Sequence, residues 1–255
     1  QSGVPPDYFS DKGQLWGTPV YTWKFHQETN FKWWISRFKR QFELVDILRL
    51  DHFRALAGFW RIAGNAKNAI EGKWINSPGK ELLNALKIEL NVDSLPIIAE
   101  DLGIVTSDVN LLRDDFQLPG MKILQFAFDG NKENPYLPEN IKGKNWVVYT
   151  GTHDNETTIS WWEGLDTQLK ERIKKQYNFF KEPSWNLIEL GMSTNANLFI
   201  TPIQDILSMD NTHRMNTPGT SVGNWKWKLA LTLEEIEDSL KKYGKLGTFH
   251  NRGNI

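Results

Sequence analysis

Cysteine is absent from the 255-residue chain, which excludes disulfides and thiolate metal sites. A charge surplus is also lacking, because 30 basic side chains face 31 acidic ones and the formal net charge is -1. Phosphate binding needs a basic surplus, so nucleic acid is not expected as the main partner. No apolar run approaches the roughly 18 residues that a membrane-spanning helix requires, so no membrane partner is expected either.

Targeting signals are also lacking. Residues 1–6 show no charged leader followed by an apolar run, so no signal peptide is visible. The missing cysteines fit a reducing compartment. We therefore expect a cytoplasmic location, with a plastid as the alternative if a transit peptide precedes residue 1. The sequence gives no indication of the oligomeric state.

The composition is otherwise that of an ordinary globular protein, with 40% hydrophobic and 24% charged residues. We expect residues 1–255 to form part of one catalytic domain, without a second domain. Aromatic residues are abundant, at 12 Trp, 6 Tyr and 14 Phe. Most of them should lie in the core, but indole rings also stack on flat ligands, sugars included.

Residues 1–24 are rich in glycine and proline and have no periodic pattern, which predicts a long loop. A loop of this length is usually a lid, a binding loop or disordered. Its aromatic residues argue against disorder. We expect an active-site loop here.

The remainder alternates between short apolar segments and amphipathic ones. Strands are predicted within residues 44–51, 95–101, 121–129, 146–154 and 198–202. Helices are predicted within residues 31–43, 79–89, 107–116, 157–162, 167–180, 184–192 and 231–243, with Ser107 as an N-cap. This alternation implies an α/β fold with a parallel sheet covered on both faces, in which function gathers at the carboxyl ends of the strands.

The first of these strand ends carries an Arg and an Asp on one face. Side chains two positions apart on a strand point to the same face, and such a set is formed here by Val45, Ile47, Arg49 and Asp51. We expect the apolar pair to lie deeper in the fold and the ion pair to lie at the open end of the strand. An adjacent Arg favours the ionised carboxylate, which is the state that a nucleophile at an anomeric carbon needs. A structural ion pair at a strand end is the alternative.

Two further strands end in acids. Glu100 ends the second predicted strand. An isolated Glu at a strand end is usually only solvated, which is the alternative to a catalytic role. Asp154 ends a later strand beside His153, where a local hydrogen bond is the alternative to a catalytic pair. Three acids at the ends of strands that would be neighbours or near-neighbours in one barrel suit glycoside chemistry, in which one carboxylate attacks and one carboxylic acid donates a proton. Repulsion between like charges would raise the pKa of Glu100 for that second task.

Other chemistries lack their motifs. A divalent metal site would need more oxygen ligands at tight spacing, such as Asp-x-Asp runs, and none is present. There is no His-Glu-x-x-His, no Gly-x-Ser-x-Gly and no glycine loop that would cradle a phosphate. No metal and no organic cofactor is expected.

Several longer motifs carry a resemblance to a known family. They are Gly3-Val4-Pro5-Pro6-Asp7-Tyr8-Phe9-Ser10, Gly13-Gln14-Leu15-Trp16-Gly17, Arg49-Leu50-Asp51-His52-Phe53-Arg54, Ile98-Ala99-Glu100-Asp101-Leu102-Gly103, Leu118-Pro119-Gly120-Met121-Lys122, Tyr149-Thr150-Gly151-Thr152-His153-Asp154-Asn155 and Gly223-Asn224-Trp225. The chain resembles the 4-alpha-glucanotransferases of glycoside hydrolase family 77, amylomaltase and the plastid disproportionating enzyme among them. The resemblance covers essentially the whole chain in the same order.

The resemblance implies a role for each acid. Asp51 would be the nucleophile, Glu100 the general acid/base and Asp154 the acid that stabilises the transition state. Arg49 would orient Asp51, and His153 would bind a sugar hydroxyl. The other glucan contacts that it implies are Asp7, Gln14, Trp16, His52, Asp101 and Asn224. The expected partners are maltooligosaccharides and longer α-1,4-glucans.

The same resemblance implies a (β/α)8 barrel, of which the chain would hold about five of eight strands. The other three would precede residue 1, since members of the family carry a substantial segment before the Gly-Val-Pro-Pro loop. An incomplete barrel exposes two strand edges. The isolated 255-residue chain is therefore expected to fold poorly and to be inactive.

The expected reaction is a retaining transfer of glucan segments between starch, glycogen or maltooligosaccharide chains. An α-amylase-like hydrolase with the same acids is the nearest alternative. An inactive fragment or a glucan-binding module is the other. The transferase and the hydrolase both require that the side chains of Asp51, Glu100 and Asp154 meet around one glucose ring.

Overall fold

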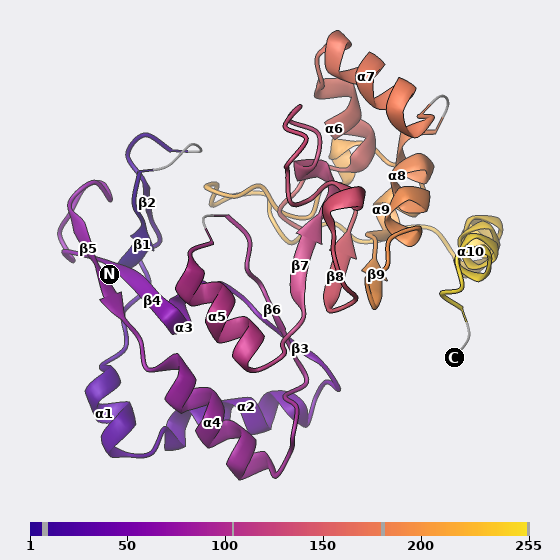
Figure 1. Ribbon diagram of the computed structural model, residues 1–255. Coiled ribbons are helices and arrows are strands. Elements are labelled where there is room, and N and C mark those ends of the chain that lie inside the picture. The colour runs from indigo at the N-terminus through magenta and orange to yellow at the C-terminus, as the bar shows by residue number, and fades with distance from the viewer. Residues whose placement is uncertain (7–9, 104, 180–181, 254–255) are drawn as a thin grey trace. The chain divides into compact units, whose positions relative to one another are not determined.

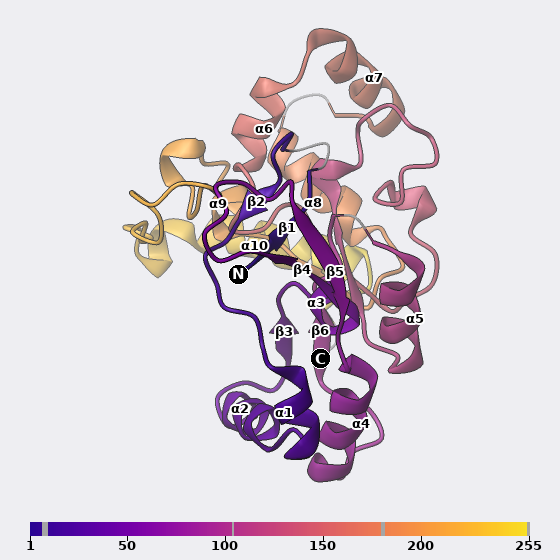
Figure 2. The ribbon, with the colours of Figure 1, turned by 90° about the vertical axis from the view of Figure 1, so that its left-hand side faces the viewer.

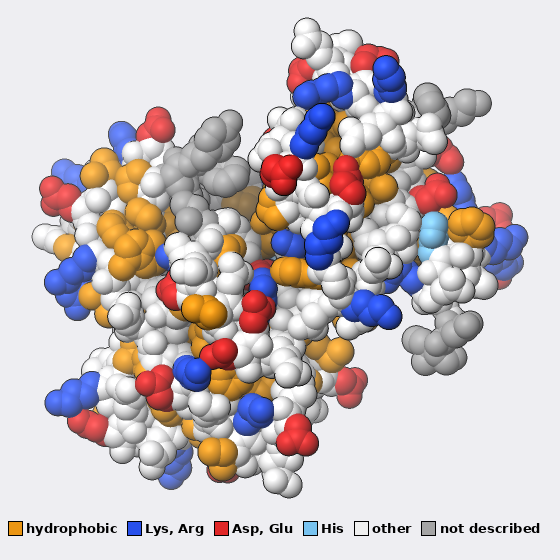
Figure 3. Space-filling model, viewed as in Figure 1, with side chains coloured by type: hydrophobic (Ala, Val, Ile, Leu, Met, Phe, Trp, Pro, Cys, Tyr) orange, Lys and Arg blue, Asp and Glu red, His pale blue; other side chains and the backbone are white. Residues whose placement is uncertain are grey.

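The computed structural model describes residues 1–6, 10–103, 105–179 and 182–253 (Figure 1). Contacts between Cα atoms divide the chain into two units, Gln1–Gly120 and Met121–Ile255. Each unit has its own hydrophobic core and is described by itself. On the face that Figure 3 shows, acidic and basic side chains are interspersed with hydrophobic ones, in keeping with the nearly neutral sequence.

The first unit contains a short parallel pair of strands. β3 (Leu48–Leu50) pairs with β6 (Ile97–Ala99) in the register Leu48 to Ile97 and Leu50 to Ala99 (Figure 2). Both strands lie within the segments predicted for them. Three helices supply most of the core around this pair, namely α2 (Lys32–Phe42), α4 (Gly79–Leu90) and α5 (Ser107–Asp115).

The helices form where the apolar period predicted them. Trp34 and Phe38 of α2 are buried one turn apart, and α4 buries Leu82, Leu83 and Leu86. These spacings place the apolar side chains on one face of each helix. The prediction of Ser107 as an N-cap is wrong by one residue, because Thr106 has the extended backbone of the cap and Ser107 is already helical.

The first predicted strand is shorter than expected. Val45 and Ile47 are 42% and 51% exposed, so the prediction that they lie deeper than the ion pair is wrong in this unit. The physical reason is the end of α2: the Leu44 and Val45 N–H groups still donate to Gln41 O, and this turn occupies the residues before β3.

The unit also holds a four-stranded antiparallel sheet in the order β2-β1-β4-β5. Its strands are β1 (Ser2–Val4), β2 (Gln14–Leu15), β4 (Gly58–Ile62) and β5 (Gly72–Asn76).

Residues 1–24 are therefore not one loop as predicted, since two strands lie within them and helix α1 (Trp23–Glu28) begins at their end. A Cβ on Gly3 would come within 2.0 Å of Gln14 O, so this close pairing requires a glycine. Helix α3 (Arg54–Ala57) leads from β3 into β4.

The second unit is built on a three-stranded sheet in the order β7-β8-β9. β7 (Gly120–Ile123) begins at the boundary between the units, and β8 (Trp146–Tyr149) pairs in parallel with β9 (Leu198–Ile200). A strand therefore occurs in each of the five predicted segments, β7 starting one residue early. That all five belong to one barrel stays a prediction.

Helices surround this sheet. They are α6 (Thr158–Gly164), α7 (Thr167–Tyr177), α8 (Pro183–Met192), α9 (Ile203–Ile206) and α10 (Leu233–Phe249), with short 3-10 turns at Leu124–Phe126, Pro138–Asn140 and Asn211–His213. Val148 of β8, Leu187 of α8 and Ile173 of α7 share one core. A capping box between Thr232 and Glu235 fixes the start of α10. Over the residues that the structure describes, no helix is long and apolar enough to cross a membrane.

Candidate active site

The parallel strands β3 and β6 bring two of the predicted acids together. Asp51 directly follows β3 and Glu100 directly follows β6, and the last paired residues are Leu50 and Ala99. Neighbouring strands lie about 4.8 Å apart, so the two acids start from adjacent points of the same sheet edge. The carboxyl end of this pair therefore presents two carboxyl groups side by side.

Asp51 forms the ion pair that the alternation predicted. Arg49 Nη2 lies 2.6 Å from Asp51 Oδ1. The Asp51 side chain is 80% exposed, whereas that of Arg49 is 27% exposed. The guanidinium is thus anchored and the carboxylate projects from it, accessible to a ligand. This geometry suits an ionised, oriented nucleophile.

Glu100 is in a different environment. Its Oε2 accepts the His52 backbone N–H at 2.6 Å, and its Oε1 accepts the Leu102 N–H at 2.9 Å. Burial raises the pKa of Glu100, and the negative charge of Asp51 adds to this; the two backbone hydrogen bonds and Arg49 act in the opposite direction. The predicted rise is therefore confirmed in direction, but its main cause is burial and not like-charge repulsion. The result favours a proton donor.

Three more predicted residues adjoin these acids. His52 has a left-handed backbone (φ 47°), and its ring meets the Trp16 indole edge-on at 4.7 Å between centroids. Trp16 Nε1 donates to Gln14 Oε1 at 3.1 Å. Burial lowers the pKa of His52, with Asp51 opposing and Arg54 contributing, which favours the neutral ring. The first unit thus gathers six of the predicted residues, namely Gln14, Trp16, Arg49, Asp51, His52 and Glu100.

Among the described residues of this unit, one predicted residue does not join them. Asp101 points the other way from Glu100 and pairs with Arg113 at 2.5 Å, and their side chains are only 4% and 10% exposed. In this structure Asp101 therefore fixes α5 to the residues after β6, and its predicted glucan contact stays a prediction. Asp7 lies outside the described residues.

In the second unit, Asp154 lies on the turn that follows β8. The turn is closed by Asn155, whose Oδ1 accepts both the N–H and the hydroxyl of Thr152 at 2.9 Å. Asp154 Oδ2 is 3.3 Å from His153 Nε2, and Asp154 Oδ1 accepts from Asn216 Nδ2 at 2.6 Å. The Asp154 side chain is 45% exposed, which leaves part of the carboxylate open to a ligand.

A buried carboxylate supports both ends of this turn. Asp205, at the end of α9, is 1% exposed and accepts from Thr150 Oγ1 at 2.6 Å, from the Thr158 N–H at 2.8 Å and from Thr158 Oγ1 at 2.8 Å. Burial raises its pKa, and these hydrogen bonds oppose the rise. Since Thr150 precedes the turn and Thr158 opens α6, Asp205 fixes the span that carries Asp154.

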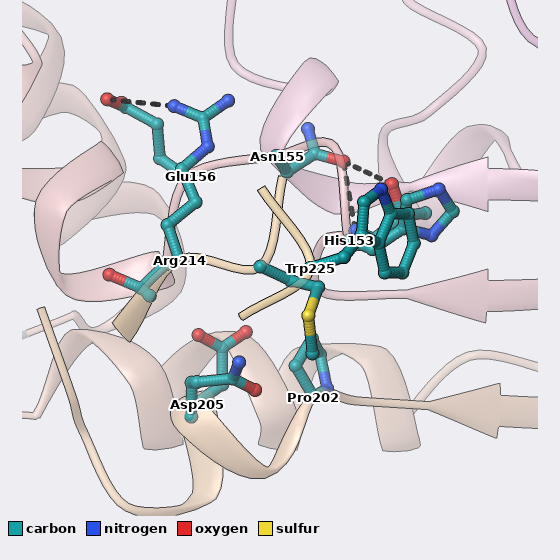
Figure 4. Close-up of a pocket in the computed structure, with 11 residues that line it drawn as sticks. His153, Asn155, Glu156, Pro202, Asp205, Arg214 and Trp225 are labelled. Carbon is teal, nitrogen blue, oxygen red and sulfur yellow. Dashed lines mark hydrogen bonds and ion pairs between the residues drawn. The ribbon is translucent and has the colours of Figure 1, made fainter. Parts of the chain in front are cut away.

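A cavity of about 170 Å³ lies beside the turn (Figure 4). Its labelled lining residues are His153, Asn155, Glu156, Pro202, Asp205, Arg214 and Trp225. The Trp225 ring lies 5.0 Å from the His153 ring and is 63% exposed. The predicted site residue Asn224 accepts from the Thr217 N–H and donates to Thr220, so it shapes the loop that carries Trp225.

Sequence reasoning missed four residues of this unit. Asn216, Arg214 and Asp205 were not predicted, and Trp225 was noted only as part of a motif. The hydrogen bond from Asn216 to Asp154 spans 62 residues, and no local spacing indicates it. In the described part of the chain, no group of three or more His, Asp or Glu side chains is arranged to hold a metal ion.

Acids at strand ends with exposed aromatic rings nearby are side chains of the kind that carbohydrate-active enzymes use. Residues 1–232 match the family model described as 4-alpha-glucanotransferase, and the chain belongs to this family. It is 48% identical to the 4-alpha-glucanotransferase of Synechocystis sp. and 44% identical to the chloroplastic/amyloplastic one of Arabidopsis thaliana, over 89% and 96% of this chain.

A solved structure agrees with this assignment. Amylomaltase from Streptococcus agalactiae, in complex with acarbose, matches 99% of this chain with a TM-score of 0.93 and 36% identity. The predicted family is therefore confirmed. The chain covers 51% of that protein, 45% of the Synechocystis relative and 44% of the Arabidopsis one. It thus spans about half the length of the relatives it matches.

Proposed function

We propose that the protein carrying this chain is a 4-alpha-glucanotransferase, which moves segments of α-1,4-glucan between maltooligosaccharide, starch or glycogen chains. The observation that carries the proposal is the pair at the end of β3 and β6: an exposed Asp51 held by Arg49 beside a half-buried Glu100 with a raised pKa. Family membership and the 48% identity to a 4-alpha-glucanotransferase support the choice of substrate.

The proposed first step breaks one glycosidic bond. The Asp51 carboxylate attacks the anomeric carbon while the Glu100 carboxylic acid donates its proton to the departing 4-oxygen of the glucan. A β-linked glycosyl-enzyme forms, and the shortened chain leaves. Retaining chemistry of this kind uses two carboxyl groups about 5–5.5 Å apart, a separation that adjacent strand ends can supply.

The proposed second step restores the α-bond. Glu100, now ionised, takes the proton from the 4-OH of an acceptor glucan, and that oxygen displaces Asp51 from the anomeric carbon. Two inversions give net retention. We assign Asp154 to the sugar hydroxyls, which it would bind more strongly as the ring flattens in the transition state. His153 and Asn224 would contact the same glucan.

The outcome is transfer only if an acceptor glucan competes with water. A positioned acceptor has an effective concentration that can exceed that of bulk water by orders of magnitude. We assign the residues around Trp16 to excluding water and to stacking on the glucan. The proposal extends to location: cytoplasm, or a plastid, as the Arabidopsis relative's name states for that protein.

The test is the product balance from maltotriose with the whole protein. Transfer yields glucose and longer chains at a constant number of reducing ends, whereas hydrolysis raises that number. We expect a constant number. A rise in step with glucose release would identify an α-amylase-like hydrolase, and no change in maltotriose would leave only a binding module.

The same assay tests the nucleophile. Asp51→Asn should lower kcat on the order of 10⁴-fold, because the amide cannot form the glycosyl-enzyme. Folding should be unchanged, since this side chain is 80% exposed. Asp46→Asn is the matched control, as Asp46 is an exposed acid on the turn before β3. Retained activity in Asp51→Asn would remove it from the mechanism.

A further inference from the structure

Asp154 is held by a second segment of the chain, residues 214–216, which lies some 60 positions further on. Arg214 Nη2 donates to Asp154 O at 2.7 Å, and the Asn216 N–H donates to His153 O at 3.1 Å. Asn216 Nδ2 donates to Asp154 Oδ1 at 2.6 Å. Backbone and side chain of the acid are therefore both held by two residues of this segment, Arg214 and Asn216.

The amide of Asn216 is itself oriented. Arg214 Nε donates to Asn216 O at 2.8 Å, and Arg214 Nη1 lies 3.8 Å from Glu156 Oε1. The backbone of residue 216 is thus tied to Arg214 on one side and to His153 on the other. Its side-chain NH₂ therefore reaches Asp154 from a fixed backbone position, and a donor placed in this way favours one rotation of the carboxylate that it meets.

The donor is also neutral. Asp51 is paired with a guanidinium, but within the described residues no Lys or Arg forms an ion pair with the Asp154 carboxylate, whose side-chain partners are Asn216 and His153. A neutral donor orients the carboxylate without cancelling its negative charge. That charge is what an acid needs if it is to stabilise an oxocarbenium-like transition state.

We infer that Asn216 is a positioning residue for Asp154, holding its Oδ1 so that Oδ2 and the open face meet the sugar. The inference rests on the proposed function, in which Asp154 stabilises the transition state. It predicts that a loss of the amide donor lowers kcat and leaves KM nearly unchanged, because the affected contact strengthens only in the transition state.

The decisive variant is Asn216→Asp in the whole protein. It keeps the size of the side chain but places a second carboxyl group against Asp154. When both are ionised they repel each other; when the pair holds one proton, an O–H···O bond replaces the N–H···O bond and the net charge of the wild-type pair returns. The activity of the variant should therefore recover as the pH falls.

The measured quantity is the ratio of variant to wild-type kcat. We expect it to rise about tenfold or more between about pH 7.5 and about pH 5.5. His153, Arg214 and Glu156 also face this turn and are the same residues in both proteins. Asn140→Asp is the control: it removes donors to Lys132 O and Asn134 O elsewhere in the unit, and its ratio should stay constant.

A ratio for Asn216→Asp that is independent of pH, or a loss confined to KM, would overturn the inference. Absence of any transfer by the wild-type protein would instead contradict the proposed function. The crystal structure of Asn216→Ala then gives a readout that does not depend on activity. Rotation of the Asp154 carboxylate supports the positioning role, and an unmoved carboxylate refutes it.

Discussion

At the scale of single residues, two carboxyl groups on adjacent strands are placed in different surroundings. Asp51 is exposed and paired with Arg49, while Glu100 is half-buried with two backbone N–H donors. Burial outweighs those donors and raises the pKa of Glu100. One acid is therefore suited to attack and the other to donate a proton, which is the division that retaining transfer requires.

Glu100→Gln should separate these roles. The variant should lose transfer between ordinary glucans by about 10²–10⁴-fold, because their leaving oxygen must be protonated. Transfer from an α-glucosyl fluoride should fall far less, since fluoride leaves with little acid help. With glucans, the wild-type rate should decline as the pH rises through the raised pKa of Glu100, because only the protonated form donates. Initial rates with both donors across pH give the comparison.

Glu81→Gln, the same change at an exposed position of α4, is the control and should leave both rates intact. Equal losses with the two donors would contradict the acid role of Glu100.

Contacts between residues close in the sequence could be predicted, whereas contacts between distant residues could not. The alternation of Arg49 and Asp51 on one strand face predicted their ion pair, because both lie within one three-residue span. The contact between Asp154 and Asn216 was not predictable in this way. Asn216 reaches Asp154 from 62 positions away, and neither residue type nor spacing records such a contact.

At the scale of elements, periodic helices were predicted well and short antiparallel strands were not. The apolar spacing in α2 and α4 is repeated over three turns and matches the buried faces. By contrast, β1 and β2 are three and two residues long, too short to show alternation, and β1 pairs with β4 nearly 60 residues away. Their formation depends on contacts between distant segments, which a local pattern cannot report.

Two helical glycines give opposite predictions at this scale. A Cβ on Gly191 of α8 would lie 2.1 Å from Phe199 Cε2 of β9, whereas one on Gly244 of α10 would meet nothing within 4 Å. Gly191→Ala should therefore lower the free energy of unfolding by about 1–3 kcal/mol through overpacking. Gly244→Ala should raise it by about 0.5–1 kcal/mol through helix propensity alone.

Denaturant unfolding of the two variants measures both effects under the same conditions. A stabilising Gly191→Ala would mean that α8 does not pack against β9 as closely as described.

At the scale of the whole molecule, the proposed reaction would divide between transfer and hydrolysis according to how long the glycosyl-enzyme is kept from water. The chain supplies Asp51, Glu100 and an aromatic neighbour, Trp16, within one unit. Trp16 is 39% exposed while one ring edge rests on His52, so it is both anchored and available to a sugar face. The complete barrel, which the family resemblance predicts, would further shield the glycosyl-enzyme from water.

Trp16→Ala in the whole protein should raise the ratio of hydrolysis to transfer severalfold. Removing the indole opens a path for water and takes away a stacking surface for the acceptor, whose advantage over water is positional. Released glucose and total reducing ends from maltotriose give the ratio directly. Trp33→Ala is the matched control, because Trp33 is 49% exposed on α2 and has no place in the proposed site. An unchanged ratio in Trp16→Ala, or an equal rise in Trp33→Ala, would show that water is excluded by other parts of the protein.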